Sequence, residues 1–491
     1  MRERLPNSAN LRMATAMDLR LLLIVAMLEL ASFCHGTYVL NVDHKFAGRG
    51  RNLRAFKSHD EIRHRRFLSA VDIPLGGNGL PSSYGLYFAN IGLGNPPKDY
   101  YVQVDTGSDI LWVNCIGCTN CPKKSDFGVK LTLYDPASSS NSSNVHCNDD
   151  FCKSTYNGAL SNCKAGGLCQ YSVVYGDGSS TSGFFVEDMV QLRKVSGNFQ
   201  TSTLNGTVVF GCGSHQAGEL GSSSEALDGI LGFGQANSSI LSQLAAARKV
   251  KKVFSHCLDT EKGGGIFVIG ESVAPQVKST PIVPNQSHYN VELESIEVDG
   301  TPLDLPSDVF TTGDGRGTII DSGTTLAYFP DIVYQTLLSM CVATQPTLSV
   351  HVVDDHFQCF SYPKNVDDGF PDVTFRFKGS VTLTARPHDY LFEIHSDVYC
   401  FGWQSGGSTS DGKQIVILGD LVLSNKLVVY DLEKQTIGWT NYNCSSSIEV
   451  KDDASSSTYL VNSHNLSSGS RPASGLGPFL LLAFVLWHAL M

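Results

Sequence analysis

The sequence predicts a mainly β protein built from two homologous halves, and three observations support this prediction. Only 17% of the 491 residues are charged and 47 are glycine, a composition that favours short strands and tight turns over long helices. Residues 87–91 and 290–298 alternate apolar and polar side chains, as half-buried strands do. A short motif, Asp-(Ser/Thr)-Gly-(Ser/Thr), occurs twice.

Each copy of the motif belongs to a longer repeated pattern. An apolar strand signal precedes it, at 101–104 in the first copy and at 317–320 in the second. Downstream of each copy, Ile-Leu-Gly recurs, at 230–232 and at 417–419. The order repeats at an offset of about 200 residues, which predicts two homologous lobes. Their expected bounds are 71–284 and 285–444, with the boundary near two prolines that bracket a short connector. Few helices are expected, and the best candidates are 239–252 and 331–342.

The N-terminus has the pattern of a secretory signal peptide over residues 1–36. Arg20 precedes an apolar run at 21–28, and small residues stand where cleavage after Gly36 would occur. The run is short for a membrane span, which argues against a signal anchor, and Met17 is an alternative start. Fourteen cysteines without the histidine spacing of a metal site agree with an oxidising compartment.

The C-terminus ends in an apolar stretch of about 14 residues, shorter than the roughly 20 that a transmembrane helix needs. A Ser-rich segment precedes it, interpreted as a linker over 445–468. This composition is typical of a GPI-attachment signal, predicted over 469–491 with Ser468 as the attachment residue. A tail anchor and an unanchored end are the alternatives. The two ends together predict the secretory pathway and attachment to the outer leaflet of the plasma membrane.

Residues 37–70 differ in charge from the rest of the chain. They hold eight basic and three acidic residues, whereas the whole chain has a net charge of −11. A basic segment can lie over an acidic cleft and mask it, so 37–70 is predicted to be a propeptide, with Arg65-Arg66 as a cleavage site. An ordinary solvated leader is the alternative. The acidic body also argues against a nucleic-acid partner, because it repels phosphate.

The two aspartates of the duplicated motif, Asp105 and Asp321, are the predicted catalytic residues. Hydrolysis of a peptide bond without a metal or a covalent intermediate needs one group that deprotonates water and another that protonates the carbonyl oxygen. Two carboxylates held face to face provide both, because neighbouring like charges do not both ionise easily and so share one proton. Each motif adds a glycine that lets backbone amides approach and hydroxyls that can brace the loops or donate to the carboxylates. These supporting residues are Thr106, Gly107, Ser108, Ser322, Gly323 and Thr324.

With these motifs, the chain from about residue 84 to residue 444 resembles the pepsin family of aspartic peptidases, the known example of such a carboxylate pair. The resemblance implies a bilobal pepsin-like acid protease fold, with two β-barrel-like lobes and the active site in the cleft between them. It implies an aspartic endopeptidase that hydrolyses polypeptides at acidic pH, without a cofactor or metal, as a monomer. Tyr175 and Gly176 would lie on a flap hairpin over the substrate, and Trp112 would hydrogen-bond the flap tyrosine.

The cysteine-rich interval 115–169 resembles the nepenthesin-type branch of plant aspartic proteases, and the C-terminal signal resembles its GPI-anchored members. The resemblance implies a disulfide between Cys359 and Cys400, another between Cys257 and Cys444 across the lobes, and a free buried thiol at Cys341. The other disulfide candidates, whose partners the sequence leaves open, are Cys115, Cys118, Cys121, Cys147, Cys152, Cys163, Cys169 and Cys212. Sequons that fit a secreted surface are at Asn141, Asn205, Asn237, Asn285 and Asn465, with a less favourable one at Asn443 beside a cysteine.

Two other classes of function were weighed against this one. A catalytically silent protease-like protein that binds or inhibits a partner at the cell wall is the main alternative, and the presence of both aspartates and both glycines argues against it. A different hydrolase is the second, but the chain has no Gly-x-Ser-x-Gly elbow and no His-Glu-x-x-His metal helix. Asp109 departs from the pattern because it adds a negative charge beside the first motif, and we expect it to face solvent or an arginine.

Overall fold

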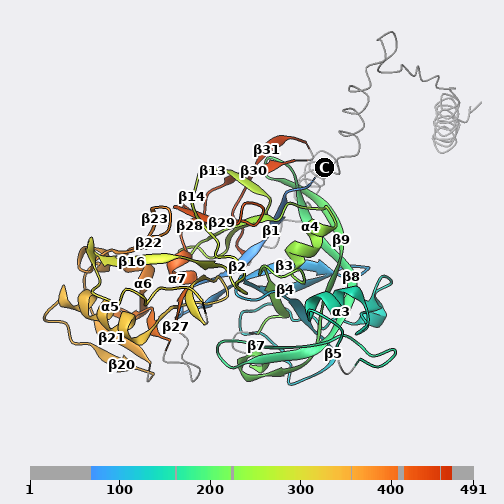
Figure 1. Ribbon diagram of the computed structural model, residues 1–491, viewed down its shortest axis with the longest axis horizontal. Coiled ribbons are helices and arrows are strands. Elements are labelled where there is room, and N and C mark those ends of the chain that lie inside the picture. Colours follow the sequence, from blue (N-terminus) through green and yellow to red (C-terminus); the bar gives the residue numbers. More distant parts are fainter. Residues whose placement is uncertain are drawn as a thin grey trace, which may run out of the picture. The chain divides into compact units, whose positions relative to one another are not determined.

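A computed structural model describes residues 68–160, 163–222, 226–313, 315–354, 356–406, 414–453 and 455–466. The predicted signal peptide 1–36, nearly all of the predicted propeptide 37–70, and the predicted GPI segment 469–491 with Ser468 lie outside these residues. Strands dominate the described part, so the predicted mainly β fold is confirmed (Figure 1). Within the described ranges, no helix is both long and apolar enough to cross a membrane.

The first lobe is a closed β-barrel. Its strands pair in a ring that begins and ends on β8, because β8 pairs with β9 on one side and with β3 on the other. In ring order the strands are β8 (Ser180–Gly197), β9 (Gln200–Ala217), β5 (Leu111–Thr119), β10 (Gly229–Gly232), β4 (Lys98–Asp105) and β3 (Leu86–Leu93). Closure leaves no free edges around this ring. Val186, Val190 and Phe210 point inward into the main apolar core.

Short strands and one small helix surround the barrel. The flap strand β7 (Gln170–Val174) and the two-residue β6 (Ser143–Asn144) both pair with β8, and β2 (Leu75–Asn78) pairs with β3. Helix α3 (Asp150–Thr155) lies in the cysteine-rich interval and was not predicted from the sequence. It is only six residues long, too short to show a helical apolar period.

The second lobe is built from three smaller sheets and the longest described helix. Figure 1 shows these yellow and orange elements gathered together. The first sheet runs β15 (Asn290–Val291), β18 (Arg316–Ile320), β27 (Gln414–Leu418), β19 (Ala327–Phe329), β26 (Trp403–Ser405). The second runs β17 (Thr301–Pro302), β16 (Leu293–Val298), β22 (Val373–Phe377), β23 (Val381–Ala385). The third runs β20 (His351–Val353), β21 (Phe357–Ser361), β25 (Val398–Phe401), β24 (Leu391–His395).

The duplicated sequence pattern corresponds to the same strand arrangement in both lobes. In the first, β4 pairs in parallel with β10, and β10 pairs antiparallel with β5. In the second, β18 pairs in parallel with β27, and β27 pairs antiparallel with β19. The recurring Ile-Leu-Gly segments are thus the strands that lie beside the strands leading into the two aspartates, with Gly232 opposite Asp105 and Leu418 opposite Ile320.

A sheet shared by both halves of the chain connects the lobes. It runs β14 (Lys278–Pro281), β29 (Thr436–Asn441), β28 (Lys426–Asp431), β11 (Val253–Leu258), β12 (Gly265–Ile269), β1 (Val71–Ile73) and then joins β8. The pairing of β11 with β28 joins a strand of the first half to one of the second, and the disulfide between Cys257 and Cys444 crosses the same boundary. Its central strands β11, β12 and β1 are wholly buried and β28 is mostly buried, whereas the edge strand β14 is mostly exposed.

The predicted helices are present, but one is shorter than expected. Helix α5 spans Asp331–Ala343, close to the predicted 331–342. Helix α4 spans only Ile240–Ala246, although the sequence suggested 239–252. It begins at an N-cap, Ser239, whose side chain accepts a hydrogen bond from the Ser242 amide, and it ends before Arg248, whose φ of 56° is left-handed. Two four-residue helices, α6 (Pro387–Tyr390) and α7 (Asp420–Leu423), complete the α-helices of the described ranges, which also contain three short 3-10 helices, Pro136–Ser138, Gly218–Gly221 and Val366–Asp368.

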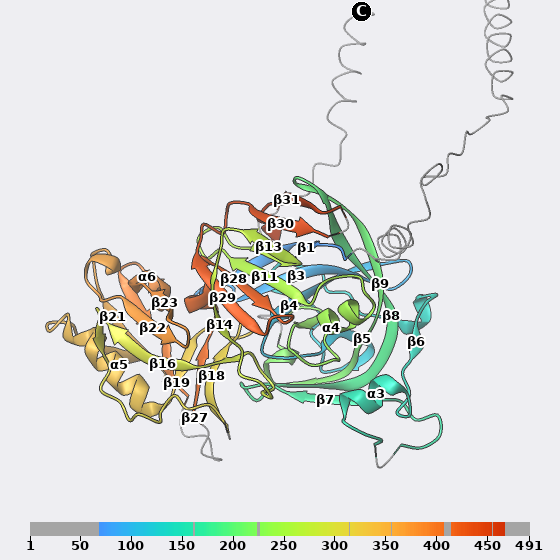
Figure 2. The same cartoon turned by 45° about the horizontal axis from the view of Figure 1, so that its top comes forward.

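The C-terminal segment folds onto the body, so the prediction of a linker over 445–468 is wrong for its described part. β30 (Ile448–Asp452) and β31 (Ser457–Val461) form a hairpin, and β30 pairs with β13 (Glu271–Ala274). Both views show this red hairpin beside β13 (Figures 1 and 2). Ile448, Val450 and Val461 are buried. The Ser-rich composition concealed an alternating pattern in which only every second residue of β30 faces solvent.

The disulfides agree with the pairings that the resemblance implied and add those that the sequence left open. Cys359 pairs with Cys400 and Cys257 with Cys444. Cys341 is buried with a free thiol. The first-lobe pairs are Cys115–Cys212, Cys118–Cys121, Cys147–Cys163 and Cys152–Cys169.

Candidate active site

The two predicted catalytic aspartates stand at equivalent places in the two lobes. Asp105 is the last residue of β4, and Asp321 directly follows β18. Both side chains are buried, at 6% and 9% exposure. Because β4 and β18 each end against a parallel Ile-Leu-Gly strand, the fold delivers both carboxylates to corresponding positions in the duplicated units.

Each carboxylate lies directly over the glycine of the opposite loop. A methyl group placed on Gly107 would come within 2.6 Å of Asp321 Oδ2 and 2.7 Å of its Oδ1. A methyl group on Gly323 would collide with Asp105 Oδ1 in the same way. Only a residue without a side chain allows this approach, so the structure brings together both aspartates and both glycines that the sequence singled out.

Each carboxylate receives matching hydrogen bonds from its own loop. The Gly107 amide donates to Asp105 Oδ1 at 2.8 Å, and the Ser108 hydroxyl donates to Asp105 Oδ2. In the second lobe, the Gly323 amide donates to Asp321 Oδ1 at 2.8 Å. The Thr324 hydroxyl donates to Oδ2 of the same carboxylate at 2.7 Å. These donors orient each carboxylate and stabilise its charged form.

Proximity and burial make the pair chemically unusual. Burial of Asp105, together with the nearby charge of Asp321, raises the pKa of the Asp105 carboxyl well above its ordinary value. The hydrogen bonds from Ser108 and Gly107 act in the opposite direction and only partly offset this. A buried pair of this kind retains one proton at acidic pH and can therefore act as an acid and a base at the same time.

One hydroxyl ties the two catalytic loops together. Thr106 Oγ1 accepts a hydrogen bond from the Ser322 amide at 2.9 Å and lies 3.4 Å from the Ile320 carbonyl. The symmetry-related link is missing, because Ser322 Oγ is buried and has no hydrogen-bond partner in the described part of the chain. The expected cross-brace is therefore one-sided: Thr106 makes it through its side chain, and Ser322 takes part through its backbone.

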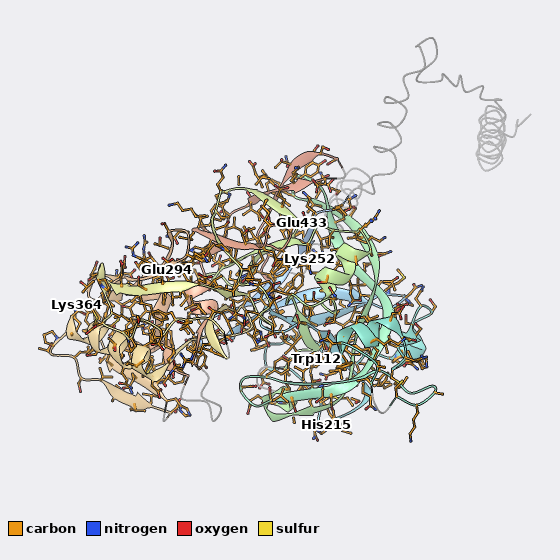
Figure 3. All side chains as sticks on the ribbon, in the orientation of Figure 1. Trp112, His215, Lys252, Glu294, Lys364 and Glu433 are labelled. Carbon is orange, nitrogen blue, oxygen red and sulfur yellow. A yellow bond between two sulfur atoms is a disulfide. The ribbon has the colours of Figure 1, made fainter. Side chains whose placement is uncertain are left out.

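The two predicted flap residues lie in the turn of a hairpin, and the hydrogen bond expected between Trp112 and Tyr175 is present. Tyr175 and Gly176 lie in the turn between β7 and β8, and the Trp112 indole N–H donates to the Tyr175 hydroxyl at 2.7 Å. Trp112, labelled in Figure 3, belongs to β5 of the same lobe. Burial and then the charge of Asp105 raise the pKa of the Tyr175 phenol, so it stays a neutral donor at every relevant pH. Gly176 has open space where a side chain would be.

Asp420 is a site residue that the sequence argument quoted but did not recognise. It follows the second Ile-Leu-Gly segment and begins α7. It is 1% exposed, and its Oδ1 has no hydrogen-bond partner among the described residues. Burial, followed by the charges of Asp321 and Asp105, raises its pKa well above the ordinary value. One signal for it was available in the sequence. The two Ile-Leu-Gly segments differ in the residue that follows the glycine, which is Phe233 in the first copy and the acidic Asp420 in the second.

The expectation for Asp109 was wrong. Its carboxylate accepts a hydrogen bond from the Ala236 amide at 2.9 Å and is partly buried, rather than facing solvent or an arginine. Burial raises its pKa, and the hydrogen bond from Ala236, then His288 and Lys252, act in the opposite direction. His288 also contacts the catalytic loop directly, with Nδ1 2.9 Å from the Gly107 carbonyl. The sequence pattern did not indicate this contact between His288 and the catalytic loop.

The remaining sequence predictions concern sites away from the dyad. The sequon asparagines 141, 205, 237, 285 and 443 are exposed, and Asn465 is half-buried. The described residues contain no group of three or more histidine, cysteine or acidic side chains arranged to hold a metal ion.

Comparison with known proteins identifies the family. Two family models match, described as xylanase inhibitor N-terminal over residues 87–271 and xylanase inhibitor C-terminal over residues 288–441. Aspartic proteinase 36 from Arabidopsis thaliana is 51% identical over 479 residues, which cover 97% of this chain and 98% of that protein. Aspartic proteinase nepenthesin-2 from Nepenthes gracilis is 28% identical over 83% of this chain and 91% of its own length.

Solved structures share the fold. Basic 7S globulin from soybean superposes with a TM-score of 0.60 at 21% identity, covering 76% of this chain and 96% of that one. Conglutin gamma from lupine seeds gives the same TM-score at 18% identity, covering 77% and 96%. At these identities the likeness shows the fold alone. The close relatives that match nearly the whole chain show more: this chain belongs to the pepsin family of aspartic peptidases, and its relatives include the nepenthesin type.

Proposed function

We propose that this protein is an active aspartic endopeptidase that hydrolyses polypeptides at acidic pH. One observation carries the proposal: two buried carboxylates, Asp105 and Asp321, each lie over the glycine of the other's loop. Each carboxylate also has its own amide and hydroxyl donors. A protein that only binds a partner would have no need to keep two carboxylates buried and facing each other at a cost in stability.

The geometry supports a mechanism with water as the nucleophile. One carboxylate of the pair is ionised and removes a proton from a water molecule held between Asp105 and Asp321, while the other is protonated and donates to the carbonyl oxygen of the scissile bond. The resulting tetrahedral intermediate collapses when the carboxylate that took the proton from water gives it to the leaving nitrogen and the C–N bond breaks. At the same time a hydroxyl of the intermediate returns its proton to the other carboxylate, so the product carbonyl forms and the pair again holds one proton.

The flap has a supporting part in this mechanism. Tyr175 is held by Trp112 beside the catalytic loop, and its phenol is close enough to Asp105 to be affected by that charge. A hairpin in this position covers the bound peptide and excludes water other than the nucleophile. The acidic working range follows from the pair itself, because at high pH it loses the proton that the carbonyl oxygen requires.

A catalytically silent binding protein is the second candidate. The observation that favours it is the name of the matching family models, which describe a xylanase inhibitor. A purified-protein assay separates the two. We expect the chain to cut an unfolded protein at acidic pH and to lose this activity with an inhibitor whose hydroxyl occupies the position between the carboxylates. Absence of cleavage under these conditions would favour the silent protein.

We also propose a location for the enzyme. The signal-peptide pattern over 1–36 and the GPI-signal pattern over 469–491 support secretion and attachment to the outer face of the plasma membrane. The basic segment at 37–70 supports synthesis as a precursor that is activated by cleavage. A phosphoinositide-specific phospholipase should release the protein from intact cells, and a protein that stays on the membrane after this treatment would indicate a peptide anchor instead.

A further inference from the structure

The carbonyl oxygen of each catalytic glycine is contacted by a side chain from the other half of the chain, and the mechanism above uses neither contact. His288 Nδ1 lies 2.9 Å from the Gly107 carbonyl oxygen. The Gln103 side-chain amide donates to the Gly323 carbonyl oxygen at 3.3 Å. His288 belongs to the segment that begins the second lobe and reaches a loop of the first, whereas Gln103 of the first lobe reaches a loop of the second. The two contacts are therefore reciprocal.

Each contact connects the strand that leads into one aspartate to the loop of the other aspartate. Gln103 is part of β4, two residues before the first catalytic aspartate. His288 precedes Tyr289, whose carbonyl accepts a hydrogen bond from the Ile320 amide at 3.1 Å. Ile320 is the last residue of β18, directly before the second catalytic aspartate. A shift of either strand is thus transmitted to the opposite catalytic loop.

The backbone of His288 is itself fixed by its neighbours. The Gln235 side-chain amide donates to the His288 carbonyl at 2.6 Å, and Lys252, labelled in Figure 3, donates to the Gln235 carbonyl at 3.3 Å. The next residue, Tyr289, is fully buried, and its hydroxyl donates to the Phe233 carbonyl at 2.6 Å. The ring of His288 therefore approaches the catalytic loop from a fixed backbone.

The acceptor determines where the His288 ring carries a proton. A carbonyl oxygen can only accept, so Nδ1 must be protonated to bond with it. Both the charged ring and the neutral Nδ1–H tautomer meet this condition. Besides the dyad, the charged side chains nearby are Asp109 of the catalytic loop and Lys252. The amide of Gln103 does not titrate, so its bond does not depend on pH.

The two glycines are the points at which such contacts have the greatest effect on the dyad. The Gly107 amide donates to Asp105 Oδ1 at 2.8 Å, and a methyl group on Gly107 would lie 2.6 Å from Asp321 Oδ2. Gly323 has the equivalent two contacts with the carboxylates exchanged. A small shift of either glycine therefore changes both the separation of the carboxylates and the donors that orient them.

We propose that His288 and Gln103 are positioning residues for the reaction: through the two glycine carbonyls they hold the catalytic loops at the separation at which the carboxylates share one proton. This inference rests on the proposed function and deepens it. If either bond is lost, the loops can move apart and the carboxylates repel each other less. The two apparent pKa values of the pair then come closer together, and the pH range in which the pair holds one proton becomes narrower.

The test compares four variants of the full chain with the wild type. His288→Leu and His288→Asn have nearly the same shape and both lack the charge of histidine, but only the asparagine has an N–H in the place of Nδ1. Gln103→Met removes the other donor and keeps the length of the side chain. Gln345→Met is the matched control, because the Gln345 amide also donates to a glycine carbonyl, that of Gly369, at 2.5 Å and outside the catalytic loops.

Loss of one hydrogen bond of this kind changes an equilibrium by about threefold to tenfold. We expect His288→Leu and Gln103→Met each to lower kcat by about this factor, to leave KM almost unchanged and to narrow the pH profile. His288→Asn should restore most of kcat and the width of the profile, and Gln345→Met should change neither.

Two results would overturn the proposal. A His288→Asn enzyme that is as slow as His288→Leu would mean that the charge or the ring of the histidine matters and the hydrogen bond does not. A wild-type kcat and pH profile in His288→Leu or in Gln103→Met would mean that the loops keep their separation without the contact.

A further measurement does not depend on activity. In a ¹⁵N NMR spectrum, the imidazole signals of His288 are those that disappear in His288→Asn. They should show a protonated Nδ1 wherever the protein is folded, with the Nδ1–H tautomer as the neutral form. A neutral Nε2–H tautomer would overturn the proposal whether or not the enzyme is active. If the wild-type protein has no activity but shows the expected tautomer, the proposed function fails while the contact between the lobes stands.

Discussion

Replacing Gly107 by alanine tests how closely the two catalytic loops approach each other. The new methyl group would lie 2.6 Å from Asp321 Oδ2, about 0.8 Å closer than an ordinary 3.4 Å contact. The backbone is not the obstacle, because Gly107 is not among the glycines with positive φ. The Asp321 carboxylate is the end of a side chain and can move away, so the fold should tolerate the change. The catalytic geometry should not.

The expected effect is therefore on rate and not on stability. A misplacement of about 1 Å at a reacting group can reduce the rate by about 100-fold, and we expect kcat of Gly107→Ala to fall by this order. The melting temperature should change by only a few degrees, corresponding to about 1 kcal/mol. Both quantities can be measured on the same purified protein, with a fluorogenic peptide and with differential scanning calorimetry.

Two further glycine variants provide a comparison for the kcat of Gly107→Ala. Gly323→Ala should be at least as damaging, because its methyl group would come still closer to Asp105. Gly406→Ala is the matched control: Gly406 is exposed, and the nearest atom to its methyl group would be 3.4 Å away. If Gly107→Ala keeps the kcat of Gly406→Ala, the carboxylates are not packed over the opposite glycines and the account of the dyad is wrong.

Three other perturbations have definite expected results. Trp112→Phe removes the donor to Tyr175 and should lower kcat/KM by about fivefold, corresponding to about 1 kcal/mol for one hydrogen bond; an unchanged value would mean that the flap does not need it. The pKa of Asp420 is raised in the folded state. The free energy of unfolding therefore falls as pH rises above the pKa of this carboxyl in the unfolded chain, which is about 4. Asp420→Asn should therefore flatten the fall in melting temperature between acidic and neutral pH, and a parallel curve would contradict this. Truncation after residue 444 should cost several kcal/mol, at about 2 kcal/mol for each buried apolar side chain of the C-terminal hairpin, whereas truncation after residue 466 should not change the melting temperature.

Most of the candidate active site could be predicted from the duplicated motif, because this motif is local and chemically specific. Asp105 and Asp321 are each fixed by a strand before them and a glycine two residues after them, and both features are visible in the sequence. The parallel Ile-Leu-Gly strands could be paired with them by repetition alone. The hydrogen bond from Trp112 to Tyr175 came from the family resemblance, since nothing local indicates that these two residues meet.

The features that the sequence did not predict depend on contacts between distant parts of the chain. Asp420 becomes a site residue only because α7 follows the strand beside Asp321, and burial in this place cannot be read from its neighbours. The C-terminal hairpin was hidden by serine-rich composition, and its partner strand β13 lies more than 170 residues away. Helix α4 was predicted too long because residues 247–252 have helical composition, but Val253 and the strand it begins pair with β28 instead.

The central claim is that Asp105 and Asp321 act as one catalytic pair, and their substitution tests it most directly. The measurement is the initial rate of cleavage of an unfolded protein at acidic pH by wild-type enzyme, Asp105→Asn and Asp321→Asn, with circular dichroism to show that all three are folded. We predict that either substitution alone abolishes turnover while the fold is kept. Cleavage at the wild-type rate by either folded variant would contradict the account.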